Sequence, residues 1–207
     1  MLNKFKEIAR AWLKSLTKPI YDVGLTPNAL TIIGLLLSIL SATIYLLHKQ
    51  GSMYVLLATL IFLLAGVCDV LDGLIAETYG KKTVLGGFLD SVFDRYSDGI
   101  IIASFIIAGL CDVNWGLAAL IGSFLVSYTR ARAESLDVNM SSVGVAERAE
   151  RVIIIVVFSL LSYVFDGALN YGIMLLAVLT NFTAIQRILY FYKKSNNPKK
   201  EPKTRIV

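Results

Sequence analysis

Five aspartates stand close together in a chain that is otherwise strongly apolar. They lie in the stretch CDVLDGLIAETYGKKTVLGGFLDSVFDRYSD, which begins at Cys68. The five are Asp69, Asp72, Asp90, Asp94 and Asp98. A carboxylate near hydrocarbon is costly unless a cation or hydrogen-bond donors compensate it. These residues therefore need a binding partner, and the nature of that partner indicates what the chain does.

The spacing of the aspartates predicts two acidic helix faces. On a helix, Asp69 and Asp72 share one face with the small residues Gly73 and Ala76. A second face, at successive steps of four residues, carries Gly86, Asp90, Asp94 and Asp98. Divalent cations such as Mg²⁺ and Mn²⁺ prefer carboxylate oxygens, and two such ions can clamp a phosphate. The two faces therefore predict a site for two divalent ions that acts on a phosphate group.

Carboxylates inside a membrane can also serve transport or hold helices together. They line channels, relay protons or pair with arginines between helices. Here they are expected at the cytoplasmic ends of two consecutive helices and not at mid-membrane, which disfavours a transport path. A small metal or proton transporter is the alternative outside the enzymes. His48 is the single histidine of the chain, so we expect neither a zinc site nor histidine-based catalysis.

Arginines gather around one predicted cytoplasmic loop. The segments SYTRARAESL and GVAERAERVIII, with TAIQR in the last apolar run, supply Arg130, Arg132, Arg148, Arg151 and Arg187. Arg148 and Arg151 are three residues apart and share a helix face, and guanidinium groups suit a phosphate monoester. The alternative is that these arginines anchor the loop under the positive-inside rule and pair with neighbouring glutamates.

The elements that position these groups are predicted to be membrane-spanning helices. The 207 residues are 56% hydrophobic, with a mean hydropathy of +0.68, which is too apolar for an ordinary soluble domain. Apolar runs of spanning length cover Asn28 to Leu47, Met53 to Ile75, Gly87 to Leu110, Trp115 to Leu136, Val145 to Val164 and Leu169 to Tyr192. We predict an all-α integral membrane protein with six transmembrane helices over residues 28–192, within a single catalytic domain over residues 1–192.

Basic residues flank the predicted spans. Apolar residues at helical spacing among lysines predict an amphipathic juxtamembrane helix over residues 1–20, and residues 193–207 form a basic cytoplasmic tail. Lysines and arginines concentrate at both termini and after the second and fourth spans. The positive-inside rule therefore predicts a multi-pass cell-membrane protein whose termini and aspartates are cytoplasmic. The pI of 9.2 then reflects topology and attraction to anionic membrane lipids, and we expect no nucleic-acid partner.

One motif of the chain is similar to a known signature. It consists of Asp69, Asp72, Gly73 and Ala76, followed after a fixed interval by Gly86, Asp90 and Asp94. They resemble the signature of the CDP-alcohol phosphotransferase family, and TPNALT at residues 26–31 resembles the start of that family's first span. The resemblance implies transfer of a substituted phosphoryl group from a CDP-linked lipid to an alcohol, with release of CMP. It also implies a homodimer that uses divalent metal at the cytoplasmic face.

The resemblance assigns a role to each matching position. It implies metal ligands at Asp69, Asp72, Asp90 and Asp94, and Asp94 is also the implied general base. It implies that the CDP-lipid contacts Asn28, Thr31, Asp72, Gly73, Ala76, Glu77 and Gly86. One position departs from the family pattern, which has arginine where this chain has Glu77. A carboxylate repels a diphosphate unless a metal, Lys81 or Lys82 intervenes.

The arginine segments indicate the acceptor alcohol. The patterns SYxxARAE and GxxERxER are similar to those of the subgroup that makes phosphatidylinositol phosphate, or its archaeal ether-lipid counterpart, from inositol phosphate. This similarity implies CDP-archaeol or CDP-diacylglycerol as the donor. It implies that the acceptor's phosphate is bound by Arg130, Arg132, Arg148, Arg151 and Arg187. Glycerol phosphate, serine or another small alcohol is the alternative acceptor.

Overall fold

The computed structural model describes residues 13–141 and 143–196, and every regular element in those ranges is helical. A first helix covers residues 13–22. The elements that follow are α2 (Pro27–Leu46), the short 3₁₀ helix η1 (His48–Gln50), α3 (Ser52–Thr78), α4 (Val84–Ala108), α5 (Val113–Glu134), α6 (Arg148–Leu161) and α7 (Ala168–Asn196). The prediction of an all-α chain is confirmed over the described residues.

Three of these helices are long and apolar enough to cross a membrane, namely α2, α3 and α7. The chain is thus built like a membrane protein. Helix α4 has 25 residues, but acidic residues interrupt the apolar character of its first half. Helix α6 has 14 residues, a length of about 21 Å, against roughly 30 Å of hydrocarbon in a bilayer.

Two predicted spans differ from the helices of the structure, at three ends in all. The span predicted from Val145 to Val164 is helical only from Arg148 to Leu161, because residues 143–147 run as an irregular segment towards α6. The last predicted span ended at Tyr192, whereas α7 continues to Asn196 and so includes the start of the predicted tail. Apolar composition continues past the end of a helix, and polar residues can continue one, so composition alone misplaces such ends.

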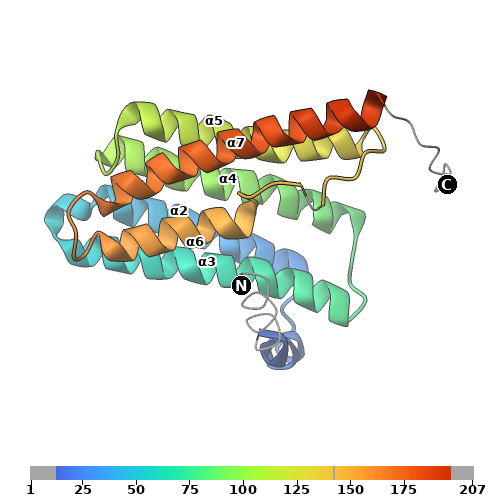
Figure 1. The fold of residues 1–207 in the computed structure, drawn as a ribbon. Coiled ribbons are helices and arrows are strands. Elements are labelled where there is room, and N and C mark those ends of the chain that lie inside the picture. Colours follow the sequence, from blue (N-terminus) through green and yellow to red (C-terminus); the bar gives the residue numbers. More distant parts are fainter. Residues whose placement is uncertain (1–12, 142, 197–207) are drawn as a thin grey trace.

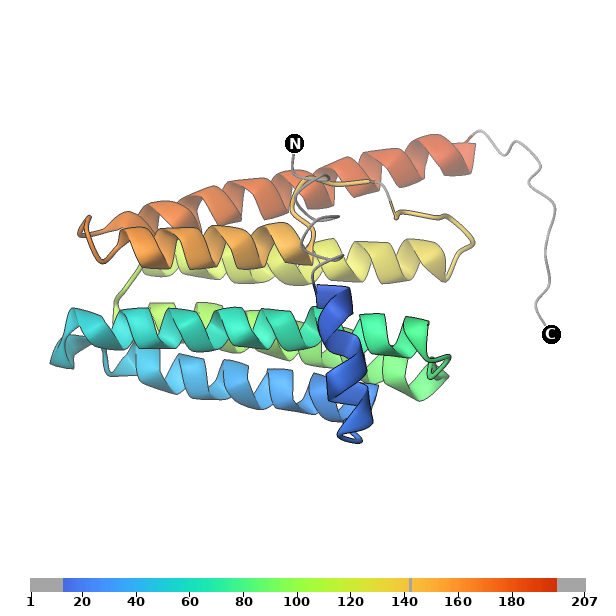
Figure 2. The same cartoon turned by 90° about the horizontal axis from the view of Figure 1, so that it is seen from below.

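The long helices form two groups. Helices α2, α3 and α4 pack together, as do α5, α6 and α7, and the groups meet where α4 contacts α5 and α3 contacts α6 (Figures 1 and 2). Consecutive long helices run in opposite directions (Figure 1). The C-terminal ends of α3, α5 and α7 therefore lie at the same end of the bundle as the N-terminal ends of α2, α4 and α6.

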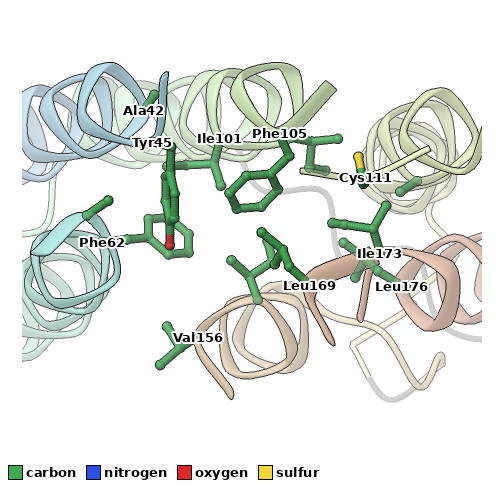
Figure 3. Close-up of a cluster of buried hydrophobic side chains, with 14 of the residues drawn as sticks. Ala42, Tyr45, Phe62, Ile101, Phe105, Cys111, Val156, Leu169, Ile173 and Leu176 are labelled. Atoms are coloured by element: carbon green, nitrogen blue, oxygen red, sulfur yellow. The ribbon is translucent and has the colours of Figure 1, made fainter. Parts of the chain in front are cut away.

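An apolar core fills the space between the two groups (Figure 3). The ring of Tyr45 meets the ring of Phe105 edge-on, with 4.7 Å between centroids, and Ile101 and Leu169 belong to the same cluster. The Tyr45 hydroxyl lies 2.9 Å from the Thr59 hydroxyl, so its polar end is satisfied inside the bundle. The outer surface is also rich in large apolar side chains, as expected for helices that face lipid.

The helix of residues 13–22 crosses one end of the bundle at a steep angle (Figure 2). Leu13 packs against α2 and α3 in a second apolar cluster that includes Leu30 and Leu71. The rings of Tyr21 and Tyr79 stack with 3.9 Å between centroids. The predicted juxtamembrane helix over residues 1–20 falls partly on residues 1–12, which lie outside the described residues.

Candidate active site

Three aspartates form an acidic cluster between α3 and α4. Asp69 and Asp72 lie near the end of α3 and Asp90 lies near the start of α4, and each offers a carboxylate oxygen within 4.8 Å of the others. The Thr31 hydroxyl, from α2, donates a 2.6 Å hydrogen bond to Asp72 Oδ2 and fixes its orientation. Carboxylates this close repel one another unless a cation joins them, and an all-oxygen donor set suits Mg²⁺ or Mn²⁺.

Asp94 lies one turn further along α4, and its carboxylate faces Arg148 at the start of α6. The Arg148 guanidinium contacts Asp94 Oδ1, and its Nε lies 3.5 Å from Asp69 Oδ2. A small cavity of about 10 Å³, roughly the volume that one water needs, is lined in part by Asp69, Asp72, Asp94 and Arg148. Arg148 thus links the arginine-bearing half of the bundle to the acidic half.

A pocket of about 250 Å³ opens beside the acidic cluster, between the ends of α2, α3 and α4. Its lining residues are Pro27, Asn28, Thr31, Asp72, Gly73, Ala76, Lys81, Lys82, Thr83, Gly86, Gly87 and Asp90. All but one of the positions predicted to contact the CDP-lipid are therefore brought together here. The exception is Glu77, which is not among the described residues that line the pocket.

The surroundings of two glycines in the pocket differ. A Cβ atom at Gly86 would lie 2.8 Å from both Asn28 Oδ1 and Thr83 Oγ1, so a larger residue there would displace these two side chains. A Cβ atom at Gly73 would meet nothing within 4 Å. Glycine at position 73 therefore keeps space open in the pocket, where a ligand can approach the helix backbone.

The buried arginines Arg151 and Arg187 serve as links inside the protein. Arg151 Nε donates to Asp98 Oδ2 at 3.1 Å, and Arg151 Nη1 donates to the Ala146 carbonyl at 3.1 Å. Arg187, from α7, is 1% exposed and donates to the Val143 carbonyl at 2.7 Å and to the Val126 carbonyl. These bonds tie α6 and the segment before it to α4, α5 and α7.

The remaining arginines of the predicted set, Arg130 and Arg132, lie near the end of α5. The side chain of Arg130 is 42% exposed, and its Nε donates to Glu134 Oε1, one turn along the same helix, at 2.9 Å. Arg132 is exposed, and its Nη1 lies 3.5 Å from the Ser135 hydroxyl. Of the five predicted arginines, Arg148 is the one that the structure brings against the signature aspartates Asp69 and Asp94.

The sequence interpretation missed several residues of the site. Pro27, Thr83 and Gly87 line the pocket, and helix-capping patterns could have placed the first two: Pro27 is the first residue of α2, and the Thr83 hydroxyl accepts from the Gly86 N–H at 2.9 Å. Asp98, on α4, pairs with Arg151 of α6. Nothing in the local spacing points to Arg151, because it comes from a distant helix.

Comparison with known proteins places this arrangement in a family. The sequence model of the CDP-alcohol phosphatidyltransferase family matches residues 24–183. The archaetidylinositol phosphate synthase of Pyrococcus horikoshii is 39% identical over 188 residues, which cover 91% of this chain and 95% of that protein. The archaetidylinositol phosphate synthase of Methanothermobacter thermautotrophicus is 39% identical over 196 residues, which cover 94% of this chain and 95% of that protein.

Solved structures of a bacterial relative share the fold. The phosphatidylinositol phosphate synthase of Mycobacterium tuberculosis with CDP-DAG bound superimposes with a TM-score of 0.76 at 28% identity, over 94% of this chain and 98% of that one. The same enzyme in complex with manganese and citrate gives a TM-score of 0.76 at 29% identity, over 87% of this chain and 88% of that one. The match to the family spans most of the chain and includes the whole acidic cluster, and the chain belongs to the CDP-alcohol phosphatidyltransferase family, as its signature residues predicted.

Proposed function

We propose that this protein transfers the lipid-phosphoryl group of a CDP-activated lipid to a hydroxyl of inositol phosphate and releases CMP. The observation that carries this proposal is the meeting of the acidic cluster, the 250 Å³ pocket and Arg148 at one end of the bundle. The names of the archaeal relatives support inositol phosphate as the acceptor. The CDP-DAG complex of the mycobacterial relative supports a CDP-linked lipid, CDP-archaeol or CDP-diacylglycerol, as the donor.

The acidic cluster is the proposed metal site. Asp69, Asp72 and Asp90 would hold one divalent ion, Mg²⁺ or Mn²⁺, and Asp94 would contribute to a second. Such ions neutralise a diphosphate and polarise the phosphorus for attack. The close carboxylate oxygens support this assignment, as does the manganese complex of the mycobacterial relative.

The protein's own groups bind, orient and move a proton. The pocket proposed for the CDP moiety is bordered by Asn28, Thr31, Gly73, Ala76 and Gly86. Glu77 directly follows Ala76 in the sequence. Arg148 orients the acceptor by its phosphate. Asp94, which contacts Arg148, accepts the proton of the attacking hydroxyl while the new oxygen–phosphorus bond forms and CMP leaves. Most of the catalysis is positioning of the two substrates and neutralisation of charge.

The other arginines of the predicted acceptor set contribute in two ways. Arg130 and Arg132 are exposed side chains that can turn towards an acceptor phosphate. Arg151 and Arg187 are committed to Asp98 and to backbone carbonyls, so they support the acceptor site by holding α6 and the preceding segment in place. Arg148 is the first residue of α6, so its position depends on both of these buried arginines.

The proposed topology has six spans, with the site and both termini in the cytoplasm of a cell-membrane protein. Residues 1–192 form one catalytic domain and residues 193–207 a basic tail. Exposed apolar side chains on α4, α5 and α6, such as Ile107, Ile121 and Val157, support burial of these helices in lipid with α2, α3 and α7. The acidic cluster and the arginine-rich segments all lie at one end of the bundle, which supports the orientation.

We also propose that the protein acts as a homodimer. A groove of about 1000 Å³ between α4 and α5 is lined largely by apolar side chains, including Phe88, Tyr96, Phe124 and Tyr128. Aromatic side chains at a concave apolar surface suit the face of a second copy. Light scattering of the detergent-purified protein should give twice the monomer mass, and replacement of Tyr96 and Tyr128 by aspartate should give the monomer mass.

The decisive test is metal-dependent CMP release by the purified protein in lipid vesicles. CDP-archaeol or CDP-diacylglycerol is supplied with inositol phosphate, glycerol phosphate or serine in separate reactions. We expect release with inositol phosphate alone. Release with another acceptor would keep the acidic site and discard the acceptor assignment, whereas ion flux across vesicles without any CMP release would indicate a transporter.

A further inference from the structure

The loop between α3 and α4 brings two lysines into the nucleotide pocket. The turn that follows α3 contains Gly80, whose φ of +63° is a left-handed conformation that glycine adopts without strain. The chain then folds back, and the Lys81 N–H donates to the Ala76 carbonyl at 3.0 Å. As a result Lys81 and Lys82 line the same pocket as Gly73 and Ala76, which lie earlier on α3.

This loop is held at both ends. On one side the ring of Tyr79 stacks on Tyr21 of the crossing helix, with an interplanar angle of 6°. On the other side Thr83 caps α4 by accepting the Gly86 N–H at 2.9 Å. The two lysines therefore stand on a short segment whose backbone is fixed by its own turn and by its neighbours. Their ammonium groups can reach a ligand without reordering of the loop.

The charges of the pocket are divided between two walls. Asp72 and Asp90 line it on the side of the acidic cluster, and the basic residues in its lining are Lys81 and Lys82. A diphosphate has negative oxygens on every side, so a metal at the carboxylates covers only part of its charge. The lysines supply positive charge where the carboxylates do not. Lysine binds phosphate as a flexible point charge, which suits a group that must be released as CMP after transfer.

We propose that Lys81 and Lys82 bind the diphosphate of the CDP-lipid in this protein and so take the charge role that an arginine at position 77 would fill. The inference rests on the proposed function, because it names the groups that bind the donor in the same site. It assigns the donor's affinity to the loop between α3 and α4 and leaves the acceptor's affinity to the arginine side of the bundle.

The test compares two double variants with the same change of charge. Lys81→Gln/Lys82→Gln removes the pocket lysines, and Lys193→Gln/Lys194→Gln removes two exposed lysines near the end of α7. For the first variant we expect the KM for the CDP-lipid to rise about tenfold or more, since two charge-assisted contacts are lost, while the KM for inositol phosphate stays within about twofold. The second variant controls for weaker attraction of the protein to an anionic membrane.

A binding experiment separates failure of this inference from failure of the proposed function. CDP is titrated into the full-length proteins in detergent with Mg²⁺ and with no acceptor present. The pocket variant should bind CDP about tenfold more weakly than the unchanged protein, and the control variant should bind as the unchanged protein does. Equal CDP affinity of the two variants, or an equal rise of the KM, would overturn the role of the lysines. CDP binding that depends on them without CMP release from any acceptor would instead overturn the proposed reaction.

Discussion

The two halves of the bundle use charged residues in opposite ways. In the half formed by α2, α3 and α4, the carboxylates of Asp69, Asp72 and Asp90 crowd together at the edge of an open pocket. In the half formed by α5, α6 and α7, Arg151 and Arg187 are buried and donate hydrogen bonds to Asp98 and to backbone carbonyls. Charges at helical spacing thus form an acidic cluster beside a pocket in one half and internal links in the other.

The chemistry of the two side chains explains the difference. A guanidinium has five N–H donors, and the irregular segment before α6 offers carbonyls outside the helices, such as those of Val143 and Ala146. An ionised carboxylate can only accept, and the N–H groups of the surrounding helices are already bonded within those helices. Arg151 and Arg187 are therefore satisfied by the protein itself, whereas the crowded oxygens of Asp69, Asp72 and Asp90 have only Arg148 and Thr31 beside them and suit a cation from outside.

Removal of one carboxylate of the cluster should have the largest effect. Asp90→Asn should lower metal-dependent CMP release by at least about a thousandfold, because one ligand of the ion that neutralises the diphosphate is lost. Mn²⁺ binding, measured by calorimetry, should weaken in parallel. Asp166→Asn, which changes an exposed aspartate of the connection between α6 and α7, is the matched control and should leave both unchanged. Unchanged Mn²⁺ affinity in the Asp90 variant would contradict the comparison of the two halves.

The second prediction concerns the carboxylate that contacts the other half. Asp94→Asn should reduce turnover by roughly a hundredfold to ten-thousandfold, since the amide cannot accept the proton of the attacking hydroxyl. Affinity for the CDP-lipid, measured without acceptor, should change far less than turnover, because Asp94 does not belong to the described lining of the pocket and the three ligands of the first proposed ion remain. Turnover equal to that of the unchanged protein would remove the assignment of Asp94 as the base.

The third prediction tests the internal links. Arg151→Met leaves the buried Asp98 without its partner and should destabilise the protein by about 3–5 kcal/mol, seen as a lower unfolding temperature in detergent. Replacement of both partners, Arg151→Met with Asp98→Leu, should recover most of that loss, because a buried pair is close to neutral against an apolar pair. If the double variant is as unstable as the single one, Arg151 has a role beyond this pair.

The smallest predicted effect separates two arginines of the same half. Arg148→Gln should raise the KM for inositol phosphate about thirtyfold, which corresponds to one charge-assisted contact of about 2 kcal/mol. Arg130→Gln should raise it by less than about fivefold, because its exposed side chain already pairs with Glu134. Equal effects would show that exposed arginines of α5 bind the acceptor as strongly as the arginine at the acidic cluster.

Local regularities made part of this site readable from the sequence. The spacings of Asp69, Asp72 and Asp90 specify helix faces, and the family signature adds the separation between the two helices. Gly73 and Gly86, which belong to the same spacings, line the pocket beside them. Bilayer thickness sets the length of a spanning helix, so long apolar runs can be recognised in the sequence. The end of α7 and both ends of α6 were predicted at other residues than the structure shows.

The tertiary structure alone decided which charges meet. The pairing of Arg148 with Asp94, of Arg151 with Asp98 and of Arg187 with the Val143 carbonyl depends on how α6 and α7 pack against distant helices. The turn at Gly80 likewise decides that Lys81 enters the pocket. Helical periodicity is a property of a few consecutive residues and can be read from their order. Contacts between helices depend on packing and on the path of the chain between them, which the spacing of residues within one helix does not encode.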